Sequence, residues 1–304
     1  MKILITGGAG FIGSNIAEHF HLSDTVTVLD NLRSGFERNL DGLKVRFIRG
    51  SVTDKAAVLE AAMGADYIFH LAAMVSVPES VEKPGETVDL NVHGTLNVLE
   101  AARTHGVKKV VISSSAAIYG DNPIVPKVES MLPEPKSPYA ITKLDAEYYA
   151  NMYTSEFRTP VVCLRYFNVF GPRQDPKSQY AAAVPIFIAR AIRNQDITIY
   201  GDGEQTRDFV YVKDVVAANE LAARSSATGV YNIACGGRIT INDLAKNIIA
   251  ITGSSSKILY APERAGDVKH SQADISRASA IGFRPQYSLE RGLKPTIEYL
   301  TTRT

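Results

Sequence analysis

Residues 2–13 read KILITGGAGFIG, a short apolar strand followed directly by a glycine-rich turn and the start of a helix. Gly7, Gly10 and Gly13 form the pattern G-x-x-G-x-x-G. Glycine permits the tight turn and lets the backbone approach a pyrophosphate, which then sits on the helix N-terminus. The next apolar run ends in Asp30-Asn31, and a carboxylate there can bind both ribose hydroxyls and repel a 2′-phosphate. The stretch therefore predicts a dinucleotide site and favours NAD over NADP.

Outward from this turn, the first half of the chain alternates short apolar runs with helical patterns. The runs are rich in Val, Ile and Leu and suit strands buried on both faces: Lys2–Thr6, Thr25–Leu29, Val45–Ile48, Tyr67–Leu71, Val107–Ser113 and Val161–Phe167. Between them lie the helical patterns Phe11–His21, Asp54–Met63, Glu86–His105 and Tyr139–Phe157. This alternation predicts a doubly wound α/β fold, a parallel Rossmann sheet with helices on both faces.

After residue 170 the alternation loosens, which predicts a smaller, mixed α/β C-terminal domain. Four helical patterns are mixed there with short strands: helices at Tyr180–Arg193, Val212–Arg224, Ile241–Ile251 and Leu289–Thr301, and strands near Thr198–Tyr200, Arg207–Val210 and Val230–Ile233. We expect residues 1–170 to form the NAD-binding domain, with the segment about 207–234 returning to it, and 171–304 to form mainly the substrate domain. Residues 123–138 hold five prolines and are expected to form a loop.

Length and composition exclude several classes of protein. The 304 residues carry 33 Lys and Arg against 32 Asp and Glu, and they contain no basic block, so binding to nucleic acid is not expected. The two cysteines, Cys163 and Cys235, exclude a disulfide framework, and the six histidines show no metal-ligand spacing. No apolar segment approaches the about 18 residues of a membrane span. We expect a cytoplasmic protein with no bound metal.

A candidate catalytic group follows from three hydroxyls and a Tyr–Lys pair. Ser113, Ser114 and Ser115 come at the carboxyl edge of the predicted sheet, where open α/β folds bind ligands. Tyr139 and Lys143 are four residues apart and share one helix face. A lysine ammonium beside a phenol lowers the phenol's pKa, which predicts Tyr139 as a general acid/base with Ser115 on the same substrate oxygen.

With these motifs in place, the chain resembles the extended short-chain dehydrogenase/reductases, and among them the nucleotide-sugar 4-epimerases. The resemblance covers nearly the whole chain. It rests on the glycine turn and the Tyr–Lys pair together with further motifs: His70-Leu71-Ala72-Ala73, Asn91, Ser113–Tyr119, Leu164–Pro172, Gly201-Asp202-Gly203, Arg207-Asp208 and Gly266-Asp267-Val268.

The resemblance implies a role for each matching residue. Tyr139, Lys143 and Ser115 would be catalytic. NAD would be bound by Gly7, Gly10, Phe11, Ile12, Gly13, Asp30, Asn31, Ser51, Val52, Leu71, Ala72, Ala73, Asn91, Ser113, Tyr139, Lys143 and Tyr166. A UDP-sugar substrate would be bound by Ser76, Ser115, Tyr139, Asn168, Val184, Tyr200, Arg207, Arg264, Asp267 and Ser271. Many relatives carry an acidic residue near the adenine where this chain has Ser51.

The resemblance also separates the reactions of this group. Related dehydratases carry an Asp-Glu pair, and related decarboxylases a Glu, just before the Tyr-Gly that ends the serine segment. This chain has Ala116 and Ala117 there. Without an acid to protonate a departing C6 hydroxyl, elimination is disfavoured, and 4-epimerisation through a transient 4-keto sugar remains.

The expected substrate pair is UDP-GlcNAc and UDP-GalNAc, with UDP-glucose and UDP-galactose left open as a second pair. Relatives restricted to the latter pair carry a tyrosine where this chain has Ser271, and a small residue leaves space for a 2-acetamido group. The run Gly171–Pro176 also resembles the N-acetylhexosamine subgroup. Alternatives are a UDP-glucuronate 4-epimerase, a reductase with exchangeable cofactor and a non-catalytic dinucleotide sensor. The resemblance further implies a homodimer formed through the helices at Glu86–His105 and Tyr139–Phe157.

Overall fold

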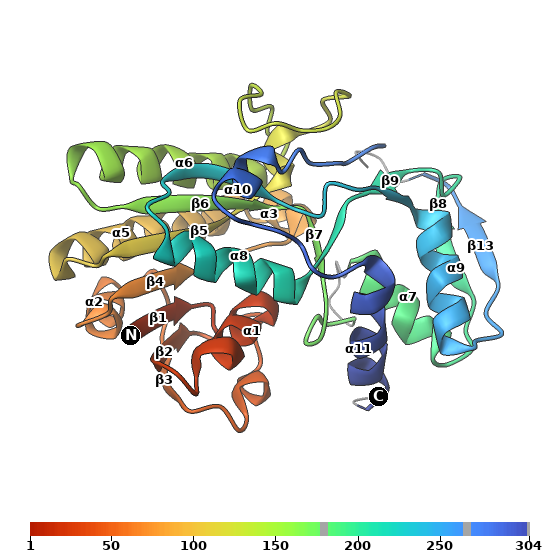
Figure 1. The fold of residues 1–304 in the computed structure, drawn as a ribbon, viewed down its shortest axis with the longest axis horizontal. Helices are drawn as coiled ribbons and strands as arrows, with labels where there is room; N and C mark the ends of the chain where they lie inside the picture. The colour runs from red at the N-terminus through yellow and green to blue at the C-terminus, as the bar shows by residue number, and fades with distance from the viewer. Residues whose placement is uncertain (177–181, 264–268, 303–304) are drawn as a thin grey trace.

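The fold is built on a sheet of seven parallel strands (Figure 1). A computed structural model describes residues 1–176, 182–263 and 269–302. The strands, in their order across the sheet, are β11 (Gly229–Ile233), β6 (Val161–Tyr166), β5 (Lys109–Ser115), β4 (Tyr67–His70), β1 (Lys2–Thr6), β2 (Thr25–Asp30) and β3 (Val45–Arg49). The order reverses at β1, so the prediction of a doubly wound parallel sheet is confirmed.

Helices bury both faces of this sheet. On one face, α1 (Phe11–Phe20) and α8 (Val212–Arg224) pack against alternate strand residues such as Ile3, Ile5 and Val28. On the other face, α2 (Lys55–Ala62), α5 (Gly94–His105) and α6 (Pro138–Glu156) pack against the intervening residues such as Leu4 and Ile68. Both faces are therefore apolar, which is why the strands read as continuous hydrophobic runs.

The C-terminal elements surround a separate hydrophobic cluster beside the sheet. Its helices are α7 (Ala183–Ala191), α9 (Ile241–Thr252) and α11 (Leu289–Thr301), all three close to prediction. Three two-stranded sheets join them, formed by β7 (Asn168–Phe170) with β10 (Phe209–Tyr211), β9 (Thr206–Arg207) with β12 (Ile239–Thr240), and β8 (Ile197–Tyr200) with β13 (Ile258–Ala261). A short helix, α10 (Ser276–Ala280), follows. Strands of two to four residues carry too little periodicity to be found from sequence, and β7, β12 and β13 were not predicted.

Three predicted elements have different boundaries in the structure, and one of them, the strand predicted near Arg207–Val210, is divided between β9 and β10 of two different sheets. The helix predicted over 86–105 is divided into α4 (Pro84–Val88), a π-helical segment (Asp89–His93) and α5, and α3 (Val77–Glu82) precedes it. Pro84 begins a new helix because it lacks an N–H, and a widened turn at Asn91 interrupts the regular ladder. Strand β5 runs to Ser115, so the three serines end the strand instead of following it.

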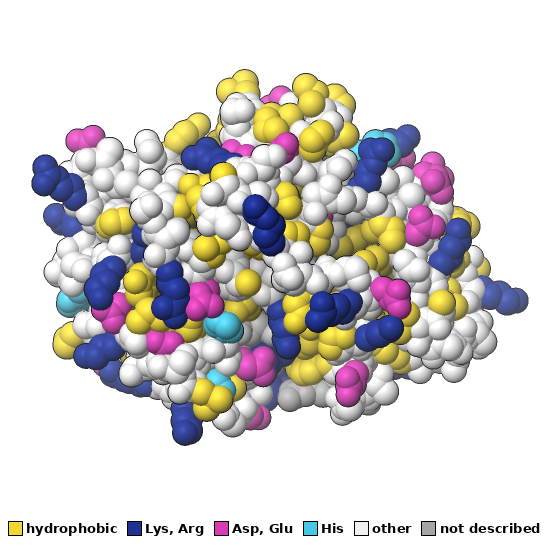
Figure 2. All heavy atoms as spheres, viewed as in Figure 1, with side chains coloured by type: hydrophobic (Ala, Val, Ile, Leu, Met, Phe, Trp, Pro, Cys, Tyr) yellow, Lys and Arg dark blue, Asp and Glu magenta, His cyan; other side chains and the backbone are white. Residues whose placement is uncertain are grey.

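The proline-rich segment is a long loop, as predicted, and it projects at the top of the molecule (Figure 1). Lys127 bridges this loop to Ala273 of the C-terminal segment. Hydrophobic side chains gather on its tip (Figure 2), where Ile124 and Leu132 are 60% and 79% exposed. Across the described ranges, no helix combines the length and the apolar character needed to cross a bilayer.

Candidate active site and dinucleotide groove

The glycine turn after β1 is held in a shape that only glycine permits at two positions. Gly7 has a φ of +71°, and a Cβ there would lie 2.6 Å from the backbone nitrogen of Ala72. A Cβ on Gly13 would lie 2.3 Å from the carbonyl oxygen of Gly7, so α1 can pack this closely only without a side chain. Gly10 is the N-cap of α1, and no described side chain caps the helix. Its first N–H groups are thus available to an anion.

Asp30 lies at the end of β2, directly beside this turn. One carboxylate oxygen accepts a hydrogen bond from the Ala9 N–H at 2.9 Å, and the other accepts from the Leu32 N–H at 2.8 Å. Each oxygen keeps a further lone pair for a hydroxyl donor. The carboxylate is therefore fixed in position and retains the capacity to bind ribose hydroxyls.

The serine strand and the Tyr–Lys helix meet as predicted. The N-terminus of α6 is fixed by the Ser137 hydroxyl, which accepts from the Ala140 N–H, and by Pro138 in the first turn. Lys143 Nζ donates to the Ser113 carbonyl at 2.7 Å and lies 5.8 Å from the centre of the Tyr139 ring. Tyr139 in turn makes a side-chain hydrogen bond with Ser115.

The predicted direction of the Tyr139 pKa is wrong for the protein without ligands. Burial raises the pKa of the Tyr139 phenol, and the hydrogen bond with Ser115 opposes this rise only in part. Burial lowers the pKa of Lys143 to about 8. Desolvation is the largest cause for both groups, because Lys143 is buried where α6 packs on β5 and the half-buried Tyr139 lies beside it. Lys143 can thus change its charge near neutral pH, while Tyr139 stays a protonated phenol.

A buried ion pair lies below these residues, one helical turn further along the same face of α6. The two oxygens of Glu147 accept from Arg165 Nε at 2.8 Å and from its terminal nitrogen at 2.7 Å, and the Ser114 hydroxyl donates to Glu147 at 2.6 Å. Both side chains of the pair are 4% exposed. These bonds join α6 to β5 and β6, so they fix the helix that carries Tyr139 and Lys143 against the serine strand.

His70, the last residue of β4, connects the end of β1 to the start of α5. Thr95 Oγ1 uses its only proton on the Asn91 carbonyl, so His70 Nε2 must donate to Thr95 at 3.0 Å. His70 Nδ1 then accepts from the Thr6 hydroxyl at 2.7 Å. Burial, with a smaller effect from Lys143, lowers the pKa of His70 to about 3. The imidazole is therefore neutral and fully hydrogen-bonded.

This arrangement predicts a loss of stability in mild acid. In the unfolded chain His70 takes up a proton near pH 6.5, whereas in the folded chain it stays neutral at pH 5. The free energy of unfolding therefore falls by about 2 kcal/mol between pH 7 and pH 5. His70→Gln is expected to remove this slope, although the variant is less stable at pH 7. Urea unfolding at both pH values measures the effect. His93→Gln, at a side chain that is 62% exposed, is the control and should keep the wild-type slope.

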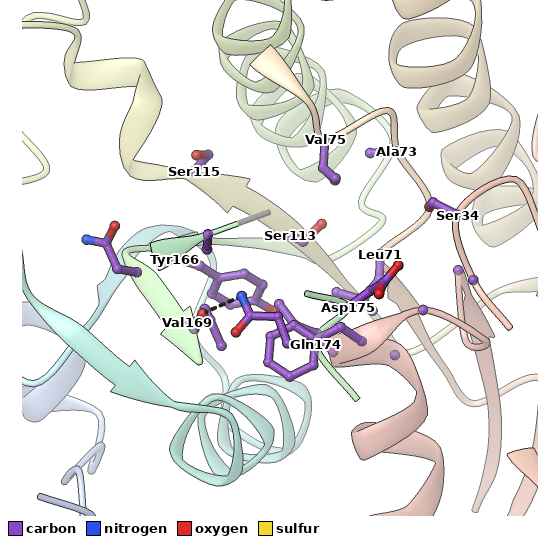
Figure 3. A pocket seen from close by; sticks show the side chains of 18 of the residues that line it. Ser34, Leu71, Ala73, Val75, Ser113, Ser115, Tyr166, Val169, Gln174 and Asp175 are labelled. Carbon is purple, nitrogen blue, oxygen red and sulfur yellow. Dashed lines mark hydrogen bonds between the residues drawn. The ribbon is translucent and has the colours of Figure 1, made fainter. Parts of the chain in front are cut away.

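The other end of the cavity is formed by the C-terminal elements. Asn168, Val184, Tyr200 and Arg207 all line it, from β7, α7, β8 and β9. Gln174 also lines it, and its Nε2 donates to the Val169 carbonyl at 3.2 Å (Figure 3). The buried Oε1 of Gln174 has no hydrogen-bond partner within the described residues, so it can accept from a ligand.

Comparison with known proteins agrees with this geometry. Residues 3–234 match the model of the NAD dependent epimerase/dehydratase family. The chain belongs to this family.

Three solved structures illustrate the likeness. The UDP-N-acetylglucosamine 4-epimerase of Methanobrevibacter ruminantium, in complex with UDP-N-acetylmuramic acid, is 41% identical, with a TM-score of 0.97 over 100% of this chain and 99% of that one. The UDP-glucose 4-epimerase of Thermotoga maritima, with UDP-glucose, is 42% identical, with a TM-score of 0.96 over 100% and 99%. The UDP-glucose 4-epimerase of Thermus thermophilus, in complex with NAD, is 37% identical, with a TM-score of 0.92 over 100% of both chains.

The residues of this NAD-dependent epimerase/dehydratase fit the cofactor of the family. The uncapped N-terminus of α1 suits the pyrophosphate, and the fixed Asp30 carboxylate suits the ribose hydroxyls. The cavity has a volume of about 1380 Å³, which exceeds the size of a typical small-molecule site and leaves room for a second nucleotide. NAD, when bound, supplies a hydride acceptor.

Most of the residues expected to bind ligands do line this cavity. They are Gly7, Gly10, Phe11, Ile12, Gly13, Asp30, Asn31, Val52, Leu71, Ala72, Ala73, Ser113, Ser115, Tyr139, Lys143, Tyr166, Asn168, Val184, Tyr200 and Arg207. Four described residues lie outside the lining: Ser51, Ser76, Asn91 and Ser271. Arg264 and Asp267 fall in 264–268, outside the described residues.

The four residues outside the lining have local partners. Ser51 bonds to Thr53, and Ser76 caps α3 by accepting from the Glu79 N–H. Asn91 spans the backbone of Met74, accepting from its N–H at 2.7 Å and donating to its carbonyl at 3.1 Å. The Ser271 N–H donates to the Thr206 carbonyl at 3.0 Å.

Several lining residues were missed from the sequence. They include Arg33, Val75, Gln174 and Arg190. Arg33 follows Asp30 by three residues, and that proximity was a usable signal. Gln174 and Arg190 reach the cavity through tertiary packing, and the local sequence carried no such signal for them.

Proposed function

We propose that this protein is an NAD-dependent UDP-hexose 4-epimerase that interconverts UDP-GlcNAc and UDP-GalNAc. The observation that carries the proposal is that Tyr139, Lys143 and Ser115 line one cavity, with Ala116 and Ala117 directly after Ser115. The site thus has an acid/base for a hydroxyl proton, and alanine stands at the two positions after Ser115 where an acid could assist the elimination of a leaving group. The names of the related structures support the same class of reaction.

In the proposed mechanism, two hydroxyls act on one substrate oxygen. In the complex with its ligands Tyr139 acts as the phenolate, which accepts the proton of the sugar 4-hydroxyl as C4 gives up its hydride and becomes a ketone, and Ser115 donates a hydrogen bond to that oxygen. The Lys143 ammonium favours the transient phenolate. After the 4-keto sugar has presented its opposite face, Tyr139 returns the proton. Arg207, at the other end of the cavity, is suited to the substrate diphosphate.

The choice of an N-acetylated sugar rests on Ser271. Its backbone bond to Thr206 places it next to β9, the strand that carries Arg207. Ser271 itself lies outside the cavity lining, and we propose that a tyrosine ring at this position would extend into the substrate end of the cavity whereas serine leaves that space free.

A single substitution tests this choice. Ser271→Tyr is expected to lower kcat/KM for UDP-GlcNAc about 100-fold and to change that for UDP-glucose much less, because the added ring clashes with the acetamido group. Ser271→Ala keeps the space and is the control. Equal losses on both sugars would show that Ser271 does not select the C2 substituent.

The decisive experiment uses the purified protein without added cofactor. It is incubated separately with UDP-GlcNAc and UDP-glucose, and the C4 epimers are resolved by chromatography. Conversion of UDP-GlcNAc supports the whole proposal, whereas conversion of UDP-glucose alone keeps the reaction and overturns the sugar assignment. If neither reacts with NAD added, the substrate assignment fails, and UDP-glucuronate is tested next.

We further propose that the enzyme is a cytoplasmic homodimer. Apolar side chains are exposed on α4 and α6, where Val88 is 41%, Ile141 54% and Tyr148 64% exposed. A second copy packed on these helices would bury them. Light scattering of the purified protein measures the oligomeric state, and a monomer would contradict this expectation.

A further inference from the structure

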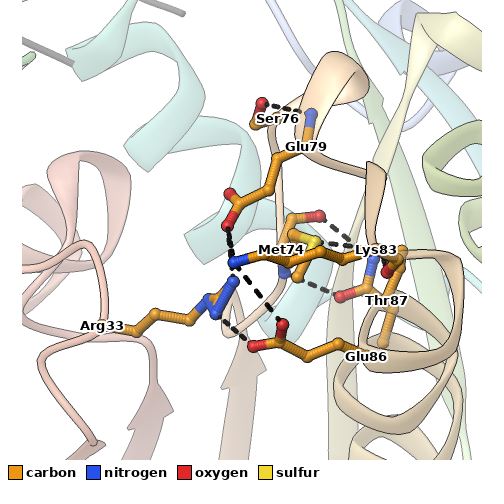
Figure 4. A network of polar contacts seen from close by, with 8 residues as sticks. Arg33, Met74, Ser76, Glu79, Lys83, Glu86 and Thr87 are labelled. Atoms are coloured by element: carbon orange, nitrogen blue, oxygen red, sulfur yellow. Dashed lines mark hydrogen bonds and ion pairs between the residues drawn. The ribbon is translucent and has the colours of Figure 1, made fainter. Parts of the chain in front are cut away.

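An arginine bridges the loop after β2 to two short helices at the cofactor end of the cavity (Figure 4). Arg33 follows β2, and its two terminal nitrogens bond to different carboxylates, Glu86 at 2.7 Å and Glu79 at 2.7 Å. Both carboxylates belong to the segment after β4, on α3 and α4. Lys83 lies on the same side as the two glutamates, 3.7 and 3.9 Å from them.

The sheet order places this bridge across the groove. Strand β1 lies between β2 and β4, and the glycine turn follows β1. A contact from the loop after β2 to the helices after β4 therefore spans the end of β1. Arg33 on one side and Ala73 and Val75 on the other line the same cavity as Gly7 and Gly13. A dinucleotide lying on the glycine turn would thus lie under the bridge.

Both ends of the bridge are fixed to the body of the protein. On the Arg33 side, Leu32 N–H donates to Asp30, and Phe36 N–H donates to the Ala9 carbonyl at 3.0 Å. On the other side, Ser76 caps α3, and the Thr87 hydroxyl lies 2.9 Å from Met74 Sδ. The ion pairs consequently join two anchored segments, and opening the groove requires that they separate.

We propose that Arg33, Glu79 and Glu86 form a strap that slows the release of the bound dinucleotide. The role assigned to the strap rests on the proposed function, because a redox-neutral epimerase reuses the same cofactor in each cycle. The strap itself can be tested without turnover. The three side chains are 27%, 29% and 49% exposed, so salt should weaken the pairs.

The test measures the release of NAD from the resting holoenzyme, by exchange of isotopically labelled NAD. Arg33→Gln is expected to speed release about three- to tenfold, in line with two partly exposed ion pairs. Lys83→Gln removes a cation that contacts the same carboxylates without crossing the groove, and it should leave release unchanged. Salt should speed release from the wild type and have little effect on Arg33→Gln.

A second variant separates the strap from a direct contact between Arg33 and the cofactor. Glu79→Gln combined with Glu86→Gln leaves the arginine in place and should speed release as much as Arg33→Gln does. If release from the double variant matches the wild type, or if Lys83→Gln has the same effect as Arg33→Gln, the strap is refuted. If the variants release NAD faster but the wild-type protein has no epimerase activity, the strap stands and the proposed function is overturned. Epimerase activity together with unchanged release from the variants would refute the strap and support the proposed function.

Discussion

Replacing Tyr139 by phenylalanine is expected to lower the rate of epimerisation by about three orders of magnitude while NAD stays bound. The substitution removes only the phenolic oxygen, and general acid–base catalysis by a positioned group contributes about 10²–10⁴-fold. The half-buried ring keeps its place in the cavity wall, so the fold and the groove keep their shape. The measurement is the initial rate with UDP-GlcNAc, together with the NAD content of the purified variant.

The same helix offers a matched control for this prediction. Tyr148 lies on α6 and is 64% exposed, and Tyr148→Phe removes the same atom far from the cavity while it keeps the ring that the proposed dimer contact would bury. Its rate should match that of the wild type. Near-normal turnover by Tyr139→Phe would remove this residue from proton transfer, whereas loss of NAD together with activity would indicate a structural role.

Glu147→Gln is expected to cost about 3–5 kcal/mol of the free energy of unfolding, because it leaves the Arg165 charge buried without its counterion. Few single substitutions in this chain should have a larger effect on stability. Urea unfolding measures it. In the exposed pair of Arg46 and Glu60, both side chains are 61% exposed, so Glu60→Gln should change the free energy of unfolding by less than about 1 kcal/mol.

A double variant separates the charge of this pair from its position. Glu147→Leu with Arg165→Met removes both charges and fills a similar volume, so most of the lost stability should return. Activity should recover less than stability, because the hydrogen bond from Ser114 to α6 is gone. Full recovery of both would show that the pair does not position the catalytic helix.

The dinucleotide groove was predictable from sequence because its parts are local. The spacing of Gly7 and Gly13, and of Tyr139 and Lys143, already implies a turn before a helix and two side chains on one helix face. The serines were predictable at the sheet edge because they end an apolar run.

The remaining features depend on contacts between distant segments. Glu147 pairs with Arg165, and Arg33 pairs with Glu79, through packing that no periodicity encodes. The raised pKa of Tyr139 likewise follows from its burial, which sequence does not give. The π-helical segment at Asn91 depends on side-chain bonds to Met74.

The position of β11 at the edge of the central sheet affects how the chain folds during synthesis and whether its two halves can be separated. Strand β6 pairs on its outer side with β11, so that Val162 lies opposite Gly229. A nascent chain that has reached only residue 170 presents β6 as an open, apolar edge, which is a template for aggregation. The cofactor half is therefore completed only after much of the other half has left the ribosome. A gene cut between the two halves would separate β6 from β11 and leave the cofactor half without the last strand of its sheet.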